Sequence, residues 1–260
     1  MSLKSKSVEE IRNSVEPADA IVVLPLGAHE QHGPHLPAET DSVIAQGVCE
    51  RLQNRLGSVN IHFLPTETVG YSVEHLDFPQ TRSLTIAQAL ERWIGIGEKL
   101  NDAGIKKLIM MNAHGGNSPI MALVAQELRV RCSMLAVATS WTRFIKGSDV
   151  VDAAEHAFGI HGGDIETSVM LELAPQMVDM SRAENFPNLQ QRLAETCTHL
   201  RAYGPHSFGW KAADLNLDGV NGDAAAASAE KGRKLLNIAV DGLAELVNDV
   251  AAFDLSALRD

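Results

Sequence analysis

The sequence has no uninterrupted apolar stretch of the roughly 18 residues that a membrane-spanning helix needs. Its first residues, 1–13, are polar and charged and lack the apolar run of a secretory signal peptide. Runs of Lys or Arg that would attract an anionic membrane surface are also missing. We therefore expect a soluble cytoplasmic protein that does not act at a membrane.

Basic residues are too few to favour a nucleic-acid partner. The chain has 22 Lys and Arg against 33 Asp and Glu, which gives a formal net charge of −11 at pH 7. A protein with this balance is repelled by the phosphate backbone of DNA and RNA. We therefore expect no nucleic-acid partner.

Cysteine is scarce, with Cys49, Cys132 and Cys197 as its only occurrences. The three are odd in number, far apart and not spaced like metal ligands, which favours reduced thiols in a cytoplasmic protein. We expect each of them to be a small core residue rather than a nucleophile.

Apolar residues make up 45% of the 260 residues, enough for a sizeable core in one domain that spans residues 1–260. Strand-like and helix-like segments alternate, which predicts βαβ units and a mostly parallel sheet in an α/β fold. Strands are expected at residues 20–26, 60–65, 106–112 and 134–140, and helices at 42–56, 85–101, 118–131, 163–173 and 224–250. The stretch 179–222 has low periodicity, so it is expected to be a lid, a binding loop or an oligomer contact.

The segment 27–41 places several histidines and carboxylates directly after the first predicted strand. Side chains two residues apart in extended backbone point the same way, so Glu30 and His32 would face a common point. Asp41 joins them if the chain turns back at Gly33. Imidazole and carboxylate ligands suit zinc, manganese, iron or cobalt. The alternative at this point is a polar surface loop whose side chains are solvated.

Two further residues lie at other element ends. His114 follows the strand at 106–112 and precedes two glycines, where it is either a ligand or a hydrogen-bonded turn residue. Glu166 falls one turn before apolar residues of its helix, so its carboxylate faces inward and needs a partner, for which a cation is well suited. The neighbouring Asp164 and Glu172 fall on other faces and are expected to be solvated.

Glu30, His32, Asp41, His114 and Glu166 therefore form a predicted set of three carboxylates and two imidazoles. Such a set can hold two divalent ions with Asp41 as the bridge, and paired ions activate water for hydrolysis. His161 precedes Glu166 by five residues and could reach the same cavity as an acid or base.

Three motifs resemble the signatures of the creatininase family, the creatinine amidohydrolases and their relatives. They are G-A-H-E-Q-H-G-P-H-L-P-A-E-T-D at 27–41, N-A-H-G-G-N at 112–117 and H-G-G-D-I-E-T-S at 161–168. Glu74-His75 with Phe78-Pro79, and the sequence G-V-N-G-D at 219–223, add to the similarity. The resemblance extends over essentially the whole chain in the expected order.

The resemblance implies a three-layer α/β sandwich with a parallel sheet between helices, a homohexamer, and two divalent ions in each subunit. Zinc is the leading expectation, with manganese or iron as alternatives. Glu30 and His114 would bind one ion, His32 and Glu166 the other, and Asp41 both. His161 would be the catalytic proton shuttle.

The chain departs from true creatininases at Gly116, where they carry an acidic residue two positions after the histidine of the second motif. Creatinine is therefore not the expected substrate. We expect a dinuclear metal-dependent amidohydrolase in which a metal-bridging water attacks a C–N bond, in an amide or cyclic amide, of a small polar substrate. The alternatives are hydrolysis of a C–C bond in a cyclic ketone such as an inosose derivative and, more remotely, a non-catalytic small-molecule binding protein.

The substrate pocket is expected to draw its walls from residues 179–222 and from a neighbouring subunit. Trp141 follows the strand at 134–140 and is either an aromatic residue near the substrate or a core residue.

Overall fold

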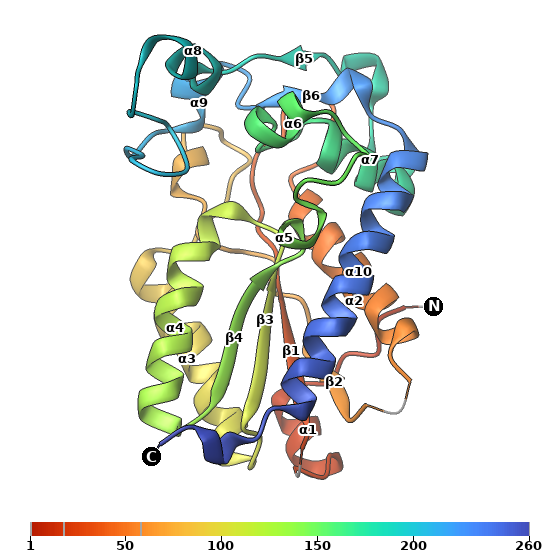
Figure 1. Cartoon of the computed structure of the whole chain (residues 1–260), viewed down its shortest axis with the longest axis vertical. Helices are drawn as coiled ribbons and strands as arrows, with labels where there is room; N and C mark the ends of the chain where they lie inside the picture. The colour runs from red at the N-terminus through yellow and green to blue at the C-terminus, as the bar shows by residue number, and fades with distance from the viewer. Residues whose placement is uncertain (1, 18, 58, 260) are drawn as a thin grey trace.

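The computed structural model describes residues 2–17, 19–57 and 59–259. Its centre is a parallel sheet with the strand order β2-β1-β3-β4 (Figure 1). The strands are β1 (Ile21–Leu26), β2 (Ile61–Phe63), β3 (Lys107–Asn112) and β4 (Leu135–Ser140). The predicted α/β class with a mostly parallel sheet is confirmed, and each of these four strands lies within the range predicted for it from the sequence.

Alternating side chains of the strands point to opposite faces of the sheet, as the period of two requires. Ile21 and Val23 of β1 belong to one apolar core, whereas Val22 and Leu24 belong to the other. Because both faces are buried, the strands read as continuous apolar runs rather than as alternating patterns.

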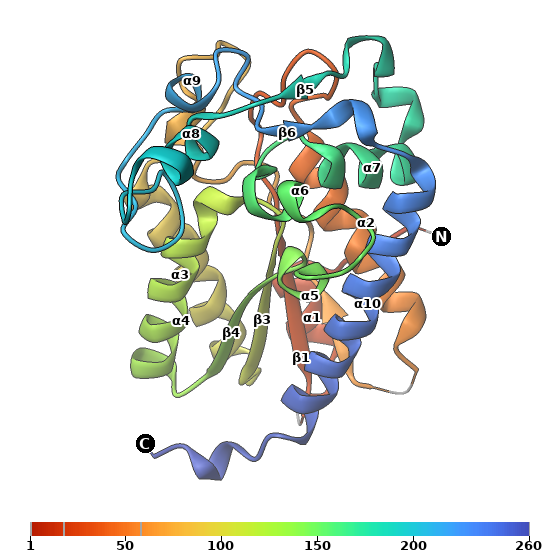
Figure 2. The same ribbon diagram turned by 45° about the horizontal axis from the view of Figure 1, so that its top comes forward.

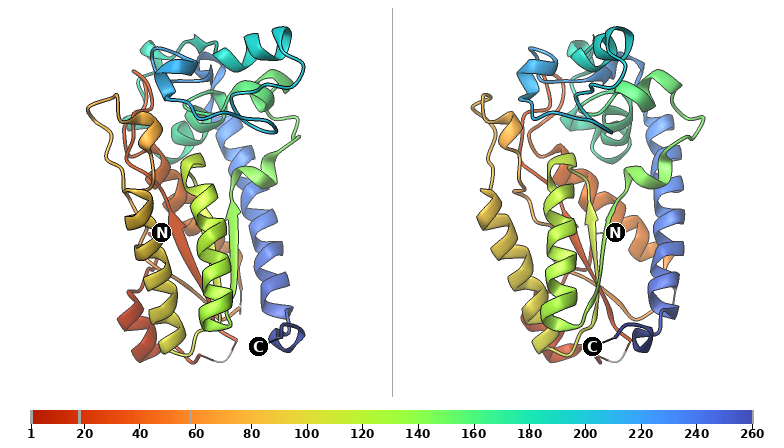
Figure 3. Two further views of the ribbon diagram at one scale, coloured as in Figure 1. Left: turned by 90° about the vertical axis from the view of Figure 1, so that its left-hand side faces the viewer. Right: turned by 60° about the vertical axis from the view of Figure 1, so that its left-hand side comes forward.

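Helices cover both faces and so form the outer layers of a three-layer sandwich (Figure 3). One face packs against α2 (Thr40–Arg55), α7 (Asp164–Leu173) and α10 (Ala229–Ala252). The other packs against α1 (Val8–Ser14), α3 (Ile86–Asp102) and α4 (Ser118–Cys132). None of the helices in the described ranges combines the length and apolar character that crossing a bilayer requires.

Short elements gather beyond the carboxyl ends of the parallel strands (Figure 2). They include α5 (Thr142–Ile145), α6 (Ala153–Phe158), α8 (Leu189–Thr196) and α9 (Ala212–Leu215), and the antiparallel pair β5 (Asn185–Phe186) and β6 (Gly222–Asp223). Single 3-10 turns at this end are η1 (Val73–His75), η2 (Gly115–Asn117), η3 (Pro175–Met177), η4 (Met180–Arg182) and η5 (Ala224–Ala226), whereas η6 (Leu255–Ala257) follows α10 near the C-terminus at the opposite end (Figure 1). The stretch 179–222 thus holds short helices and strands that the sequence pattern did not reveal.

Three details correct or resolve the sequence predictions. The terminal helix begins at Ala229 rather than at residue 224, because η5 precedes it. Asp164 is not solvated: it is 3% exposed, accepts a hydrogen bond from Ser168 Oγ at 2.8 Å and pairs with Lys231 Nζ. Trp141 is fully buried in the apolar core, which decides between the two alternatives for it.

The free thiols follow the prediction in part. Cys49 and Cys132 are buried core residues, whereas Cys197 is half-buried in the segment beyond the sheet. Burial raises the pKa of the Cys49 thiol, so that side chain is not an activated nucleophile.

The contact between α7 and α10 depends on a glycine. A Cβ at Gly232 would overlap the carbonyl oxygen of Ser168 and lie 2.5 Å from its carbonyl carbon. These are backbone atoms of α7, so relief would require the two helices to separate. Gly95 in α3 is the matched case with open space, since no atom lies within 4 Å of the point that its Cβ would occupy.

We expect Gly232→Ala to lower the free energy of unfolding by about 1–3 kcal/mol, because overpacking forces backbone shifts. Gly95→Ala should instead raise it by about 0.5–1 kcal/mol, because alanine loses less conformational entropy in a helix. Urea denaturation of the two variants measures both effects. A Gly232→Ala protein as stable as the parent would show that α7 and α10 do not pack this closely.

Candidate metal centre

The candidate centre lies at the switch point of the sheet, between the neighbouring strands β1 and β3. The connection from β1 leads to β2 on one side of β1, whereas β3 lies on its other side. In open α/β sheets, ligands bind in the crevice outside the carboxyl ends of the strands at this point. Glu30 and His32 follow β1, and His114 follows β3. All three side chains are at most 4% exposed.

The loop after β1 folds back on itself and returns Asp41 to the end of the strand. Glu30 N–H donates to the Ala38 carbonyl at 3.1 Å, which closes the loop. Gly33 adopts φ +76° with a methyl group of Val220 where its Cβ would be. Asp41 then lies in the first turn of α2 and is 1% exposed.

One group of side chains consists of Glu30, Asp41 and His114. His114 Nδ1 lies 3.0 Å from Glu30 Oε1 and 3.4 Å from Asp41 Oδ2. His114 Nε2 lies 2.9 Å from the Tyr71 carbonyl oxygen, which can only accept a hydrogen bond. Nε2 therefore carries a proton, and Nδ1 faces the two carboxylates, where its lone pair can bind a metal ion once Nδ1 is deprotonated.

A second group consists of His32, Asp41 and Glu166. His32 Nε2 lies 3.3 Å from Asp41 Oδ1 and 3.8 Å from Glu166 Oε2. His32 Nδ1 lies 3.0 Å from the Glu30 carbonyl oxygen, so it is the donor and Nε2 faces the group. Glu166 extends from the first turn of α7 and accepts a hydrogen bond from Gly162 N–H at 2.7 Å.

The structure thus brings together all five side chains predicted as ligands, and Asp41 contributes one oxygen to each group. In the described part of the chain, both oxygens of Glu30, Oδ2 of Asp41 and Nε2 of His32 are buried without a hydrogen bond of acceptable geometry. Glu30 Oε1 is in ion-pair range of His114 but forms no well-directed hydrogen bond with it. Unpaired buried charge is costly, so this donor set fits divalent cations.

The pKa values of the cluster also indicate a site for cations. Burial raises the pKa of Asp41, and it raises the pKa of Glu166 to about 7. Burial opposes protonation of His32, but Asp41 and Glu166 outweigh it and bring the pKa of His32 to about 10. Without cations, protons must neutralise these crowded carboxylates, and metal ions can replace those protons.

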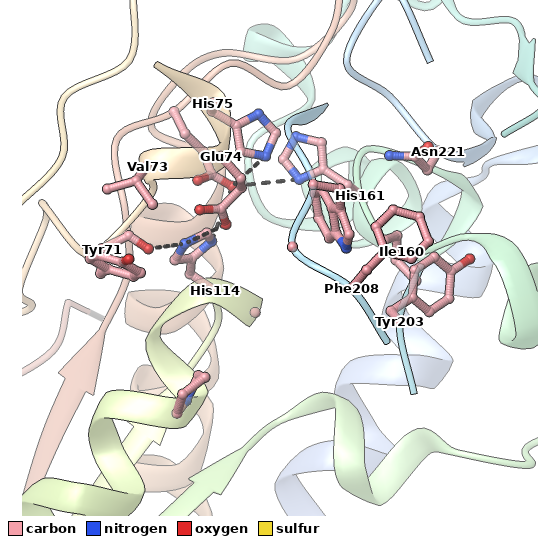
Figure 4. Close-up of a pocket in the computed structure, with 16 residues that line it drawn as sticks. Tyr71, Val73, Glu74, His75, His114, Ile160, His161, Tyr203, Phe208 and Asn221 are labelled. Atoms are coloured by element: carbon pink, nitrogen blue, oxygen red, sulfur yellow. Dashed lines mark hydrogen bonds and ion pairs between the residues drawn. The ribbon is translucent and has the colours of Figure 1, made fainter. Parts of the chain in front are cut away.

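His161 borders the cluster on the pocket side (Figure 4). Its Nε2 donates to the Gln31 carbonyl at 2.7 Å, and its Nδ1 lies 3.5 Å from Glu30 Oε1. The ring centroid is 4.1 Å from that of His32. Burial and the nearby histidines lower the pKa of His161 well below its ordinary value.

Two residues of the site were not predicted from the sequence. His75 Nε2 lies 3.8 Å from Glu30 Oε1, and Glu74 Oε1 lies 3.7 Å from His114 Nε2. With Glu30 they form a further group with metal-ligand geometry. Their only sequence signal was the similarity of Glu74-His75 to the family pattern, because the 3-10 turn η1 that holds them follows no strand directly.

The other histidines of the 27–41 segment lie outside the cluster. His35 Nε2 contacts the Gly162 carbonyl and Thr167 Oγ1, both at 3.0 Å, and supports the third motif. His29 Nδ1 lies 3.8 Å from Glu39 Oε1 at the protein surface.

A cavity of about 460 Å³ opens onto the cluster. Its base includes Glu30, His114 and His161. Tyr71, Tyr203 and Phe208 line it (Figure 4), and Trp210 is a fourth aromatic side chain of the wall. The part of the prediction that assigns pocket walls to the stretch 179–222 is therefore confirmed, and the contribution of a neighbouring subunit stays a prediction.

Fold and site together define an α/β protein with a buried cluster of histidines and carboxylates at the base of a small pocket. The profile of the creatininase family, described as creatinine amidohydrolase, matches residues 4–247. The chain belongs to the creatininase family.

Curated relatives and solved structures agree with this membership. The chain is 29% identical to creatinine amidohydrolase of Pseudomonas putida, over 93% of this chain and 94% of the relative. It is 30% identical to the mycofactocin precursor peptide peptidase of Mycolicibacterium smegmatis, over 87% and 84%. A structure titled "Creatininase Mn" superposes with a TM-score of 0.76 at 28% identity, over 95% of this chain and 100% of that one. The names of the two relatives describe an amidohydrolase and a peptidase.

Because Asp41 belongs to both groups, we expect Asp41→Asn to lose most of the bound metal, whereas His29→Gln in the same segment should retain it. Metal content per chain after dialysis, measured by inductively coupled plasma mass spectrometry, compares the variants. Metal saturation should also raise the melting temperature of the parent, since about 100-fold excess over Kd stabilises by about 2.7 kcal/mol. An Asp41→Asn protein with a full metal complement would contradict the assignment.

Proposed function

We propose that the protein is a metal-dependent amidohydrolase that cleaves a C–N bond of a small polar substrate. The observation that carries the proposal is the position of Asp41 between two groups of buried, unsatisfied ligand atoms. The relatives named as an amidohydrolase and a peptidase support the choice of C–N hydrolysis.

Glu30, Asp41 and His114 would hold one divalent ion, and His32, Asp41 and Glu166 the other. Zinc is our first choice, and manganese or iron suits the same ligands. When bound, such ions supply an activated water at neutral pH and polarise a substrate carbonyl. Backbone carbonyls hold the ligand rings in place, since His32 donates to Glu30 and His114 to Tyr71.

His161 is the proposed proton carrier. Its Nε2 is engaged with the Gln31 carbonyl, which leaves Nδ1 free on the side of Glu30 and the cavity. A ring nitrogen in this position can take a proton from the attacking water and deliver it to the leaving nitrogen. Asn221, paired through its backbone with His161, lies beside it in the cavity wall.

The cavity limits the substrate to a small molecule or the end of a chain. Its volume of about 460 Å³ is in the lower half of the range for small-molecule sites. Tyr203, Phe208 and Trp210 offer apolar faces that exclude water, and Trp210 Nε1 is already satisfied by the Ala202 carbonyl. Flat amides or cyclic amides fit this environment, whereas Gly116 argues against creatinine itself.

Three wider expectations accompany the proposal. From the family resemblance and the composition we expect a single creatininase-like domain over residues 1–260, assembly into a homohexamer and a cytoplasmic location. Size-exclusion chromatography with light scattering measures the assembly state directly.

Replacing the proposed proton carrier should slow turnover without removing the metal. We expect His161→Asn to lower kcat about 10²- to 10⁴-fold, the usual range for losing a general acid–base group. The exposed His199→Asn is the control and should leave kcat unchanged. A His161→Asn enzyme with full activity would remove His161 from the mechanism.

Product analysis separates the proposed reaction from the C–C alternative. We expect metal-loaded protein to release ammonia or an amine from small linear or cyclic amides, detected by a coupled ammonia assay and by mass spectrometry. Hydrolysis of a cyclic diketone or inosose to an acid, with no amine released, would favour the C–C alternative. Binding of these compounds without turnover would favour the non-catalytic one.

A further inference from the structure

Gly116 has no room for the acidic side chain that true creatininases carry at this position. A Cβ there would overlap the Tyr71 carbonyl oxygen and lie 2.5 Å from His114 Nε2. It would also lie 2.7 Å from Glu74 Oε1. The space beside His114 is therefore already occupied, and one of the atoms that occupy it is the carboxylate oxygen Oε1 of Glu74.

The turn that carries Glu74 is fastened to the second motif. Tyr71 N–H donates to Asn117 Oδ1 at 2.9 Å, and the Tyr71 carbonyl accepts from His114 Nε2 at 2.9 Å. Ser72 N–H donates to Ser83 Oγ at 2.8 Å, which fixes the other side of the turn. These bonds hold η1 against the segment that contains Gly116. Glu74 therefore reaches the site from η1 and not from the 112–117 motif.

The Glu74 carboxylate faces the cluster. Its side chain is 15% exposed and lines the cavity. One of its oxygens lies within 4.8 Å of ligand atoms of Glu30 and His75. Among the described residues, no Lys or Arg forms an ion pair with it, and the side chain in ion-pair range is that of His114, whose Nε2 lies 3.7 Å from Glu74 Oε1. A half-buried carboxylate in this position needs a cation.

We propose that Glu74 is the carboxylate that completes the metal centre on its pocket side, next to the Glu30, Asp41 and His114 group. The inference rests on the proposed metal-dependent function. It also balances the charge: Glu30, Asp41, Glu166 and Glu74 together carry four negative charges, equal to the charge of two divalent ions.

The test measures metal affinity rather than activity. Apo protein is titrated with zinc in the presence of a competing chromophoric chelator, and the two dissociation constants are fitted. Glu74→Gln keeps the size of the side chain. We expect it to raise the dissociation constant of one of the two ions about 10- to 100-fold, the range seen when supporting residues of metal sites are replaced. The dissociation constant of the other ion should change by no more than a factor of about two to three.

Two further variants make the result specific. Asp77→Asn, in the same segment, removes an exposed carboxylate that pairs with Lys211 at 3.0 Å and should change neither constant. Glu74→Asp retains the charge on a shorter side chain and should recover part of the lost affinity. Recovery by aspartate would not be expected if Glu74 only supported the shape of the turn.

The failures are distinguishable. Parent protein that binds no divalent ion would overturn the proposed function itself. If the parent binds two ions, then a Glu74→Gln protein with both constants unchanged would overturn the role of Glu74 alone. An equal loss at both ions, with no recovery in Glu74→Asp, would also overturn it, because that pattern indicates a displaced turn.

Discussion

Two buried carboxylates, Glu30 and Asp41, and the largely buried Glu166 lie together at the end of one parallel sheet, and they are the constraint on which the site depends. Glu30, Asp41 and Glu166 repel one another, and burial removes the water that would otherwise screen them. The protein orients imidazoles toward them rather than Lys or Arg. His32, His114 and His161 each donate one ring N–H to a backbone carbonyl, so the other ring nitrogen of each faces the cluster. An imidazole can release its proton and bind a metal ion in its place, whereas a lysine would occupy the space as a fixed cation.

The topology explains why residues from distant motifs meet. Adjacent strands β1 and β3 are parallel and in register from Ile21 and Lys107 to Leu26 and Asn112. Their carboxyl ends therefore coincide, and the loops that follow them must share one crevice. The first turn of α7 places Glu166 in the crevice. The close packing of α7 against α10 at Gly232 determines the position of this helix, and with it the position of the Glu166 carboxylate.

The sequence was sufficient where a residue's role follows from its place at an element end. Glu30, His32 and His114 come directly after strands that apolar runs reveal, and Glu166 lies on a helix with a clear inward face. Glu74 and His75 lie in a single 3-10 turn, where no periodicity marks them, and only the packing of that turn on His114 brings them in. The elements α8, α9, β5 and β6 are too short to show a repeating pattern, and tertiary contacts determine them.

Val220 links two motifs that are far apart in the chain. One of its methyl groups occupies the space beside Gly33, and the other lies 3.1 Å from the point that a Cβ of Gly162 would occupy. Both glycines have positive φ, +76° and +65°, so each is restricted in its own right. Changes at these three positions should therefore be strongly non-additive. Grafting the segment around Val220 from a relative onto this scaffold would require both glycine-containing loops to be transferred with it.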